Sequence, residues 1–361
     1  MRQTIKVEVA KGKEYNIEIS DNSFEKLNLD IAEETKGQKR VVVMSKKVYE
    51  LYYDYLDFYE DEIFILKDGE KEKNYKNYLE IIKFAIERGL TRNDVMIAVG
   101  GGVVGDITGF AASTYMRGID YIQVPTTLLS AVDSSVGGKT AIDMKEAKNI
   151  VGTFYQPKRV YININFLKTL DKRQYLSGIG EILKYAFIED NCGYKHCLFF
   201  FEYLTLCCEK LLEQEPMTLM RVIEYCLNLK IAVVNQDEKE SGLRKILNFG
   251  HTYGHALESL GKYKNYLHGE AVVQGMFFIF NYAYSKGLIT YSYYRLSIDL
   301  LSKYGFKSLR TKFSPDIIIE RMKRDKKAQT DKISFIIPIE KRKVEEIKLS
   351  FDDIENMFIE A

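Results

Sequence analysis

The fold is decided by the stretch VMIAVGGGVVGDITGFAA, which runs from Val95 to Ala112. Its first five residues form an apolar run typical of a buried strand, and its last six can continue as a helix. Between them, Gly100, Gly102 and Gly105 satisfy G-x-G-x-x-G in the strand–turn–helix context that this pattern requires. Glycines let backbone N–H groups approach a ligand closely, and the following helix N-terminus favours an anion. The stretch predicts a dinucleotide-binding loop, although a tight turn without a ligand satisfies the same pattern.

A second group of motifs follows this loop. Its members are Met116-Arg117-Gly118, Gln123-Val124-Pro125-Thr126-Thr127-Leu128-Leu129, Ala131-Val132-Asp133-Ser134-Ser135-Val136-Gly137-Gly138-Lys139-Thr140 and Lys148-Asn149. Gly138-Lys139-Thr140 looks like the end of a phosphate-binding P-loop, but that pattern requires glycine where this chain has Asp133. The spacing therefore excludes a nucleoside triphosphatase of the P-loop type.

Composition narrows the class of protein. The chain has 361 residues, enough for two domains, and 52 Lys plus Arg balance 51 Asp plus Glu. A dedicated nucleic-acid or membrane-surface protein normally carries a basic excess, so we expect neither nucleic acid nor membrane as a partner. No segment approaches the roughly 20 apolar residues that span a bilayer. The first residues lack the apolar core of a signal peptide, which favours a cytoplasmic protein.

All five cysteines lie between Cys192 and Cys226 and show no C-x-x-C spacing. In a cytosolic chain we expect them to be reduced residues of a helical core. A metal role together with His196 would need ligands that this spacing does not supply.

The first half of the chain alternates strand and helix patterns. Residues 5–9 and 15–19 alternate apolar and polar as in a β-hairpin, and further strands are expected at 40–45, 62–66, 95–99 and 120–124. Apolar positions at helical spacing predict a helix over 72–88. This alternation predicts a Rossmann-like α/β domain with a parallel sheet over residues 1–171.

From residue 172 to 361 the pattern is mostly helical. Helices are predicted near 174–190, 196–213, 217–236, 248–260, 269–286 and 290–304, and a strand pair at 333–337 and 344–349 precedes a terminal helix. We expect two domains that meet near Asp171, with the active site in the cleft between them.

Three of the four histidines, His251, His255 and His268, lie within eighteen residues. The first two stand at i and i+4 and so share one helix face, and His268 opens the next helix. A catalytic zinc site takes three protein ligands, and Glu181 is the candidate for a carboxylate ligand. The alternative is that these histidines cap or pack the helices.

Two other hydrolytic classes lack their motifs. A metalloprotease H-E-x-x-H motif is excluded because Thr252 occupies the glutamate position, and no G-x-S-x-G nucleophile elbow occurs. Several cations within the motifs suit a phosphorylated, carboxylated substrate instead; they are Arg117, Lys139, Lys148, Lys184, Lys230 and Arg244.

The motifs quoted above closely resemble those of the 3-dehydroquinate synthase family, and the resemblance extends from the Asp68-Gly69-Glu70-Lys71-Glu72-Lys73 segment to Asp325-Lys326-Lys327. The resemblance implies a dehydroquinate synthase-like fold, bound NAD, a zinc or cobalt ion, and a homodimer. It implies that NAD contacts Asp68, Glu70, Lys73, Gly102, Val103, Val104, Gly105, Asp106, Thr126, Thr127, Lys139, Lys148, Phe166, Thr169 and Leu170. It places the metal ligands at Glu181, His251 and His268.

The resemblance also implies a substrate site. Its residues are Arg117, Asp133, Lys139, Asn149, Lys184, Lys230, Arg244, Asn248, His255 and either Lys326 or Lys327. The catalytic set is Glu181, Lys184, His255, Lys139, Asn149 and Arg244. The chain departs from the family pattern at Asp171 and Gln174, where proline and glutamate are usual, and at the cysteine-rich stretch Cys192–Cys208.

The reaction that this family implies converts the sugar phosphate 3-deoxy-arabino-heptulosonate 7-phosphate to 3-dehydroquinate. NAD oxidises the hydroxyl at carbon 5, phosphate leaves by elimination, NADH returns its hydride, and ring opening with an internal aldol closure follows. We assign proton transfer near carbon 5 to His255.

Three alternatives remain open. The first is a metal-dependent polyol dehydrogenase such as glycerol dehydrogenase, which would release NADH stoichiometrically. The second is another sugar-phosphate cyclase that makes an inosose or a valiolone; those relatives tend to change the positions matching Asn248 and His255, which this chain keeps. The third is a nucleotide-sensing or scaffold protein descended from the enzyme.

Overall fold

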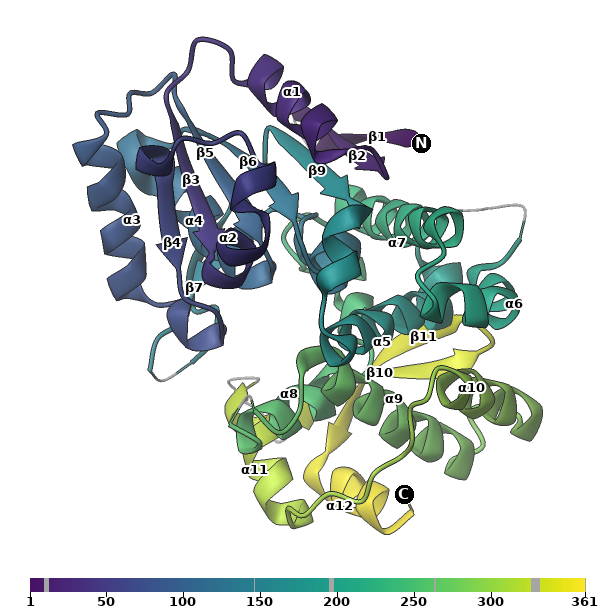
Figure 1. Ribbon diagram of the computed structural model, residues 1–361. Helices are drawn as coiled ribbons and strands as arrows, with labels where there is room; N and C mark the ends of the chain where they lie inside the picture. Colours follow the sequence, from purple (N-terminus) through teal and green to yellow (C-terminus); the bar gives the residue numbers. More distant parts are fainter. Residues whose placement is uncertain (10–12, 146, 195–197, 263, 326–331, 361) are drawn as a thin grey trace. The chain divides into compact units, whose positions relative to one another are not determined.

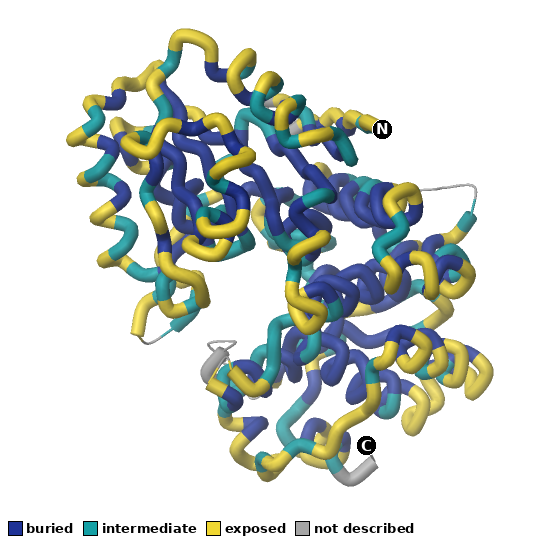
Figure 2. Tube along the Cα trace, viewed as in Figure 1, coloured by how far each residue is buried: buried dark blue, intermediate teal, exposed yellow. Residues whose placement is uncertain are grey.

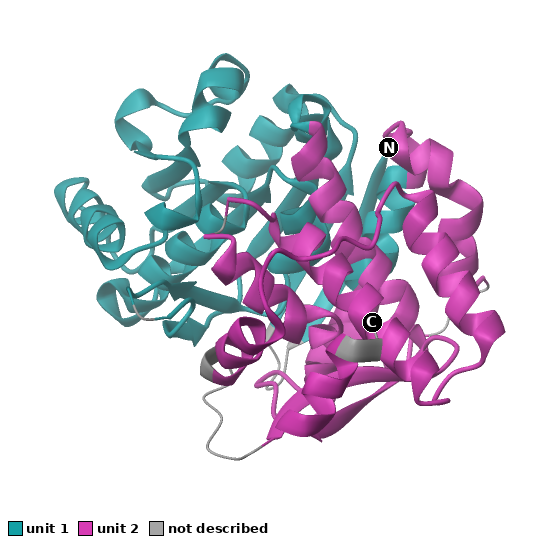
Figure 3. Ribbon diagram, turned by 90° about the horizontal axis from the view of Figure 1, so that it is seen from below, with its two compact units in different colours: residues 1–171, 219–227 teal, residues 172–218, 228–361 magenta. Residues whose placement is uncertain are grey.

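The computed structural model describes residues 1–9, 13–145, 147–194, 198–262, 264–325 and 332–360. It divides into two compact units (Figure 3). Unit 1 comprises Met1–Asp171 and Leu219–Leu227, and unit 2 comprises Lys172–Thr218 and Asn228–Ala361. Among the described residues, no helix combines the length and the apolar character that crossing a bilayer demands.

Unit 1 is built on a seven-stranded sheet with the order β1-β2-β9-β6-β5-β3-β4 (Figure 1). The strands are β1 (Arg2–Val9), β2 (Lys13–Ser20), β3 (Arg40–Ser45), β4 (Ile63–Leu66), β5 (Val95–Gly100), β6 (Asp120–Pro125) and β9 (Arg159–Asn163). Only the β1–β2 pair of this sheet is antiparallel, and every other neighbouring pair is parallel. The predicted parallel sheet with an N-terminal hairpin is therefore confirmed.

Helices cover both faces of this sheet. They are α1 (Phe24–Glu34), α2 (Lys46–Tyr52), α3 (Tyr75–Glu87) and α4 (Gly102–Thr114). Residues of α3 and α4 share one apolar cluster with alternate side chains of β3 and β5, and residues of α1 and α2 share the other. Because β3 and β5 are buried on both faces, they read as continuous apolar runs rather than as alternating ones (Figure 2).

A separate antiparallel pair, β7 (Lys139–Ile142) and β8 (Val151–Phe154), was not predicted from the sequence. Gly137 and Gly138 precede β7 with positive φ angles of 98° and 66°. A strand thus follows Gly138, where a P-loop would continue into a helix, and the exclusion of a P-loop is confirmed.

Unit 2 is mainly helical, as predicted. Its helices are α5 (Lys172–Ile188), α6 (Phe200–Leu212), α8 (His251–Leu260), α9 (His268–Ser285), α10 (Tyr291–Lys303), α11 (Pro315–Asp325) and α12 (Phe351–Glu360). The helix α7 (Pro216–Gln236) belongs to this region of the sequence, but its middle residues, 219–227, group with unit 1. The predicted strand pair is β10 (Lys332–Glu340) with β11 (Lys343–Ser350). The helix α11 was not predicted because few of its residues are apolar.

Glycines allow α9 to pack closely against two neighbouring helices. A Cβ atom on Gly269 would clash with the carbonyl of Ser177 in α5, and one on Gly180 would lie 2.5 Å from the carbonyl of Gly269. Between α8 and α9, a Cβ on Gly250 would lie 2.6 Å from the carbonyl oxygen of Val272. These contacts between backbones bring α5, α8 and α9 together at the point where their polar side chains converge.

Candidate functional site

The glycine loop of unit 1 has the geometry that the sequence predicted. Gly100 ends β5 and Gly102 opens α4, while the helix cap at Gly101 offers no side chain to the first N–H groups of the helix. A Cβ on Gly105 would lie 3.2 Å from Oε1 of Gln123, so glycine at this position allows α4 to pack tightly on β6. The uncapped N–H groups and the helix dipole make this end of α4 suited to a phosphate.

Other predicted cofactor residues follow parallel strands of the same sheet. Thr126 and Thr127 follow β6, Asp68 and Glu70 follow β4, and the segment with Phe166, Thr169 and Leu170 follows β9. Since the carboxyl ends of parallel strands meet at one edge of a sheet, the fold brings these residues to the edge where α/β sheets bind ligands.

Lys73 is the centre of a polar cluster at this edge. Its side chain is 5% exposed, and its Nζ lies 2.6 Å from Oδ1 of Asn149, 3.0 Å from Oδ2 of Asp106 and 3.1 Å from Oε1 of Glu70. Burial lowers the pKa of Lys73, but these carboxylates outweigh it and the net pKa is raised. Lys73 therefore carries its positive charge and connects a residue of the glycine loop to Asn149.

The pKa values of two carboxylates around Lys73 shift in opposite directions. Burial raises the pKa of Asp106 despite the Lys73 ammonium. Glu70 is also buried in part, but Lys73 and Lys148 lower its pKa to about 2. Lys148 Nζ lies 3.2 Å from Glu70 Oε1, so two predicted cofactor lysines share one carboxylate.

Three further predicted residues of unit 1 lie in unusual backbone conformations or at exposed positions. Arg117 is exposed and has a φ of 68°, next to Met116 at 49°, which is uncommon for residues other than glycine. Asp133 lies in a short π-helix, Ser130–Ser134, and Lys139 is exposed at the start of β7. π-Helical turns are frequent at functional sites.

In unit 2, Glu181, His251 and His268 come together from three different helices. Oε1 of Glu181 lies 3.5 Å from Nε2 of His251 and 3.4 Å from Nε2 of His268. The ligand atoms of the three side chains all lie within 4.8 Å of one another. The alternative that these histidines only cap or pack helices does not account for two Nε2 atoms aimed at one carboxylate oxygen.

Each of these two histidines is held through its other ring nitrogen. Nδ1 of His251 lies 3.0 Å from the carbonyl oxygen of Phe249, and Nδ1 of His268 lies 3.0 Å from Oε2 of Glu258. Both partners are acceptors, so each Nδ1 donates and each Nε2 is left to face Glu181. A neutral imidazole with a free Nε2 is the form that binds a metal.

The residues present fit a divalent cation. Among the described residues, none donates a well-directed hydrogen bond to the buried Oε1 of Glu181, which faces the two Nε2 atoms. Oε2 of the same carboxylate lies 2.6 Å from Nζ of Lys184. One carboxylate and two imidazoles are the ligand set of a catalytic zinc site with three protein ligands. Glu181, His251 and His268 would hold the cation.

Electrostatics in this cluster favour an ionised carboxylate. Burial alone would raise the pKa of Glu181, but Lys184 and the two histidines hold it well below its usual range. Burial lowers the pKa of His251 well below its usual value. Burial opposes a charge on His268 too, but Glu258 and Glu181 raise its pKa to about 10. The same negative surroundings that attract a proton to His268 would attract a metal cation.

The remaining predicted substrate residues of unit 2 differ in exposure. Lys184, Lys230 and Arg244 are all buried, and Arg244 donates to the backbone carbonyl of Glu238. Asn248 is half-buried, and its Nδ2 lies 2.6 Å from Oε1 of Glu240. His255 is half-buried one turn after His251, with ring centroids 5.3 Å apart. Lys326, the predicted C-terminal substrate residue, and its alternative Lys327 lie outside the described residues.

Sequence reasoning missed several polar residues that support the site. Asp143 accepts the backbone N–H of Asn149 at 2.8 Å, and Asp237 accepts the N–H of Arg244 at 3.0 Å. Glu258 contacts His268, as described above. Glu258 could have been found from its spacing, because it lies one turn after His255 on the same helix. The other two, Asp143 and Asp237, act within short irregular segments, for which the sequence offers no periodic pattern.

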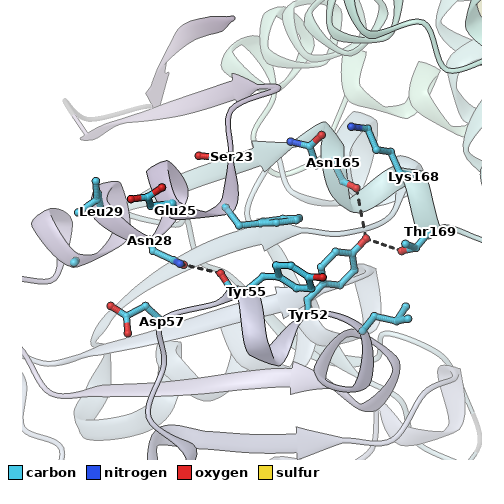
Figure 4. Close-up of a pocket in the computed structure, with 13 residues that line it drawn as sticks. Ser23, Glu25, Asn28, Leu29, Tyr52, Tyr55, Asp57, Asn165, Lys168 and Thr169 are labelled. Carbon is cyan, nitrogen blue, oxygen red and sulfur yellow. Dashed lines mark hydrogen bonds between the residues drawn. The ribbon is translucent and has the colours of Figure 1, made fainter.

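A cavity of about 790 Å³ in unit 1 is lined mostly by residues outside the predicted site. Figure 4 shows Tyr52 and Tyr55 in it, with Tyr52 Oη 2.6 Å from Oγ1 of Thr169. Thr169 is its one member from the predicted site residues, and Phe24 adds to its apolar lining. A mostly apolar lining does not suit a phosphorylated sugar, so we assign the site to the polar clusters instead.

Comparison with known proteins identifies the family. Residues 63–177 match the family described as 3-dehydroquinate synthase N-terminal, and residues 178–328 match 3-dehydroquinate synthase C-terminal. The chain belongs to the 3-dehydroquinate synthase family. The family member of that name from Alkaliphilus metalliredigens is 47% identical over 290 residues, or 80% of each chain. The one from Thermoanaerobacter sp. is 39% identical and covers 95% of this chain and 96% of its own. The resemblance noted from the motifs is confirmed.

Solved structures show the same fold. A 2-deoxy-scyllo-inosose synthase complexed with carbaglucose-6-phosphate, NAD+ and Co2+ has a TM-score of 0.85 at 25% identity, and covers 99% of this chain and 100% of its own. A 2-epi-5-epi-valiolone synthase from Streptomyces hygroscopicus with NAD+ and Zn2+ has a TM-score of 0.84 at 25% identity, with 98% of each chain covered. The fold is therefore that of the 3-dehydroquinate synthase-like cyclases, as predicted.

A probable glycerol dehydrogenase from Sinorhizobium meliloti is also similar, with a TM-score of 0.65, 15% identity and 93% of each chain covered. At that identity the likeness shows a shared fold alone. The polyol dehydrogenase alternative is thus related in architecture, and the family assignment separates it from this chain.

Proposed function

We propose that this chain is a 3-dehydroquinate synthase that converts 3-deoxy-D-arabino-heptulosonate 7-phosphate to 3-dehydroquinate and phosphate, with NAD and a divalent cation as cofactors. The observation that carries the proposal is the family match over residues 63–328, which includes both the glycine loop and the metal-ligand cluster. The reaction belongs to the shikimate pathway of aromatic amino acid biosynthesis and has no net redox change.

We assign cofactor binding to the edge of the unit 1 sheet. Backbone N–H groups of Gly102, Val103 and Val104 at the start of α4 would receive the pyrophosphate of NAD. The cluster around Lys73 would fix the loop residue Asp106 in place and hold Asn149 for the substrate. The segments with Asp68, Thr126 and Thr169 would line the rest of the nucleotide.

Unit 2 supplies the groups for the chemical steps. When bound, NAD accepts and returns a hydride at carbon 5, and the divalent cation polarises the neighbouring hydroxyls. We assign His255 to proton transfer at the carbon 5 hydroxyl, because it lies beside the proposed ligands without belonging to their set. The buried cations Lys184, Lys230 and Arg244 would bind the phosphate and the carboxylate of the substrate.

The same cations argue against a polyol dehydrogenase. Their positive charges suit a phosphorylated, carboxylated substrate, and a polyol offers them no anion. A scaffold protein would gain nothing from the convergence of Glu181, His251 and His268. On the strength of the family assignment, we also propose that the chain acts as a cytoplasmic homodimer.

Phosphate release tests the proposal. The purified protein would be given the heptulosonate phosphate with catalytic NAD and Zn2+, while phosphate, dehydroquinate and NADH absorbance are followed together. We expect one phosphate per dehydroquinate and no accumulation of NADH. A Glu181→Gln variant is the matched control for metal-dependent turnover.

Other outcomes would replace the proposal with a specific alternative. NADH formation from glycerol without phosphate release would indicate a polyol dehydrogenase. Turnover of glucose 6-phosphate, of which the carbaglucose-6-phosphate bound by the inosose synthase is an analogue, would indicate a different cyclase.

A further inference from the structure

Two overlapping groups of side chains in unit 2 could hold a metal ion. One is Glu181, His251 and His268, and the other is His255, Glu258 and His268. His268 belongs to both, and the hydrogen bonds around its ring determine which of its two ring nitrogens would face the metal.

The imidazole of His268 lies between two buried carboxylates. Its Nδ1 lies 3.0 Å from Oε2 of Glu258, and its Nε2 lies 3.4 Å from Oε1 of Glu181. The side chains of Glu258 and Glu181 are 8% and 0% exposed, so water competes little with either contact. Of the two distances, only the one to Glu258 is a normal hydrogen bond.

We propose that Glu258 is a positioning residue for the metal site. It accepts the Nδ1 proton of His268, fixes the tautomer with a free Nε2, and sets the rotation of the ring so that Nε2 faces Glu181. This inference rests on the proposed function, because it concerns the metal site on which that function depends. A carboxylate behind a ligating histidine also makes the imidazole more basic and so a better ligand.

The arrangement around His251 supports this division of roles. There the Nδ1 acceptor is the backbone carbonyl of Phe249, at 3.0 Å, and Nε2 faces the same oxygen of Glu181. Both histidines thus use Nδ1 for orientation and Nε2 for the site. His251 receives its orientation from the main chain, whereas His268 depends on one side chain that can be substituted.

The position of Glu258 on α8 places it within reach of His268. Glu258 lies two turns after His251 and one turn after His255, so it shares their helix face. The close backbone contact of α8 with α9 at Gly254, where a Cβ would lie 2.9 Å from the carbonyl of Ala271, keeps Glu258 within reach of His268 at the start of α9.

Metal binding to the purified apoprotein tests the proposal without a catalytic assay. Binding of Co2+ and Zn2+ would be measured by competition with a chromophoric chelator, and the visible absorption of bound Co2+ would report the coordination. We expect Glu258→Gln to weaken binding 10- to 100-fold, which is the usual effect of removing such a partner. The Co2+ spectrum should keep the intensity of the unsubstituted protein once the site is saturated, and Glu258→Asp should restore part of the affinity.

Two comparisons make the result specific. Glu270→Gln is the matched control, because Glu270 lies near His268 on α9 but pairs with Arg173 at 2.7 Å; its metal affinity should stay within threefold of the unsubstituted value. Glu181→Gln removes a ligand and should lose metal more completely than Glu258→Gln. Far-UV circular dichroism of each apoprotein would confirm that it is folded.

The outcomes separate this inference from the proposed function. Unchanged affinity in Glu258→Gln, with metal lost in Glu181→Gln, would overturn the positioning role and leave the metal site intact. Loss of metal in both Glu258→Gln and His255→Ala, but not in Glu181→Gln, would place the metal in the other group and overturn it as well. Unchanged affinity in all three variants would refute the metal site itself.

Discussion

Nζ of Lys73 lies 2.6 Å from Oδ1 of Asn149, although 76 positions separate the two residues in the chain. The same ammonium reaches Asp106 in the glycine loop at 3.0 Å. A residue assigned to the substrate and a residue assigned to NAD are therefore held by one buried cation within unit 1.

Replacement of Lys73 with methionine should lower both stability and substrate affinity. The variant leaves Glu70 and Asp106 without their shared cation and releases the amide of Asn149. Removing one partner of a buried pair typically costs about 3–5 kcal/mol, and partial exposure of both carboxylates reduces the expected loss to about 2–3 kcal/mol. Urea unfolding gives the stability and steady-state kinetics give the KM.

Lys71→Met is the matched control for that variant, because Lys71 is exposed two positions earlier. It should change the unfolding free energy by less than about 0.5 kcal/mol. Equal losses of unfolding free energy in Lys73→Met and Lys71→Met would show that the buried contacts of Lys73 add nothing beyond one positive charge in this segment.

Substitutions of His251 and His255 should have different effects, because we assign His251 to metal binding and His255 to proton transfer. We expect His251→Ala to lose most bound zinc, since Nε2 of His251 faces Glu181. His255→Ala should retain its zinc and lose turnover by about 10²–10⁴-fold, the usual contribution of a general acid or base. Elemental analysis of the dialysed proteins and phosphate-release kinetics provide the two readouts. Full turnover in His255→Ala would disprove its assignment.

A methyl group at Gly269 should disrupt the helix crossing. In Gly269→Ala the new Cβ would collide with the carbonyl of Ser177, and both atoms are held by helical backbones. Overpacking of a core costs about 1–3 kcal/mol, and a backbone collision should lie at or above the upper end. We expect a lower melting temperature and weaker zinc binding together.

Gly287→Ala is the comparison for Gly269→Ala. Gly287 has a φ of +67° but open space around it, so alanine there should cost only about 1–2 kcal/mol of conformational strain and leave zinc binding unchanged. A larger loss for Gly287→Ala than for Gly269→Ala would contradict the importance of the crossing.

Glu189 should make the stability of unit 2 depend on pH. Burial raises its pKa from 4.5 to about 7, although the Phe200 N–H donates to it and Arg342 lies 3.9 Å away. Because the folded state holds this proton more tightly than the unfolded state, stability falls as pH rises from about 4.5 to 7.

Glu189→Gln should remove this dependence. The variant keeps an acceptor for the Phe200 N–H and carries no charge, so its advantage over the unsubstituted protein should grow to about 2 kcal/mol near pH 8, after allowance for solvent screening. Unfolding free energies from pH 4.5 to pH 8 provide the test. Glu202→Gln, which removes a more exposed partner of Arg342, should show no such trend. If the difference in unfolding free energy between Glu189→Gln and the unsubstituted protein did not change with pH, the raised pKa of Glu189 would be refuted.

Local patterns predicted those parts of the fold whose residues act within one element. The apolar run before Gly100 and the glycines after it identified β5 and the start of α4, because strand burial and tight turns leave direct traces in sequence. The helices of unit 2 were found from their apolar spacing. The helix α11 was missed because, among its residues whose burial is described, Ile318, Ile319 and Met322 are the buried ones and many of the rest are charged.

The candidate site was predictable in part. His251 and His255 share a helix face, which the i, i+4 spacing shows directly, but no local pattern links either of them to Glu181, at least 70 positions earlier. Glu181 was a candidate because the site needed a carboxylate, and the family resemblance named the same residue. Asp143 and Glu240 were missed because their partners are fixed by loops. These contacts lie within irregular segments, six and eight positions apart in the chain, and such segments have no period in the sequence.

The glycines at the α9 crossings restrict how the metal site can change. Since the main chains of α5, α8 and α9 meet at Gly180, Gly269 and Gly250, the spacing among the three ligands is set by the scaffold and not by the ligands themselves. A shorter side chain in place of a histidine would leave a gap that no helix could move in to fill. Transplanting this site into another protein would therefore require copying the glycines before the histidines.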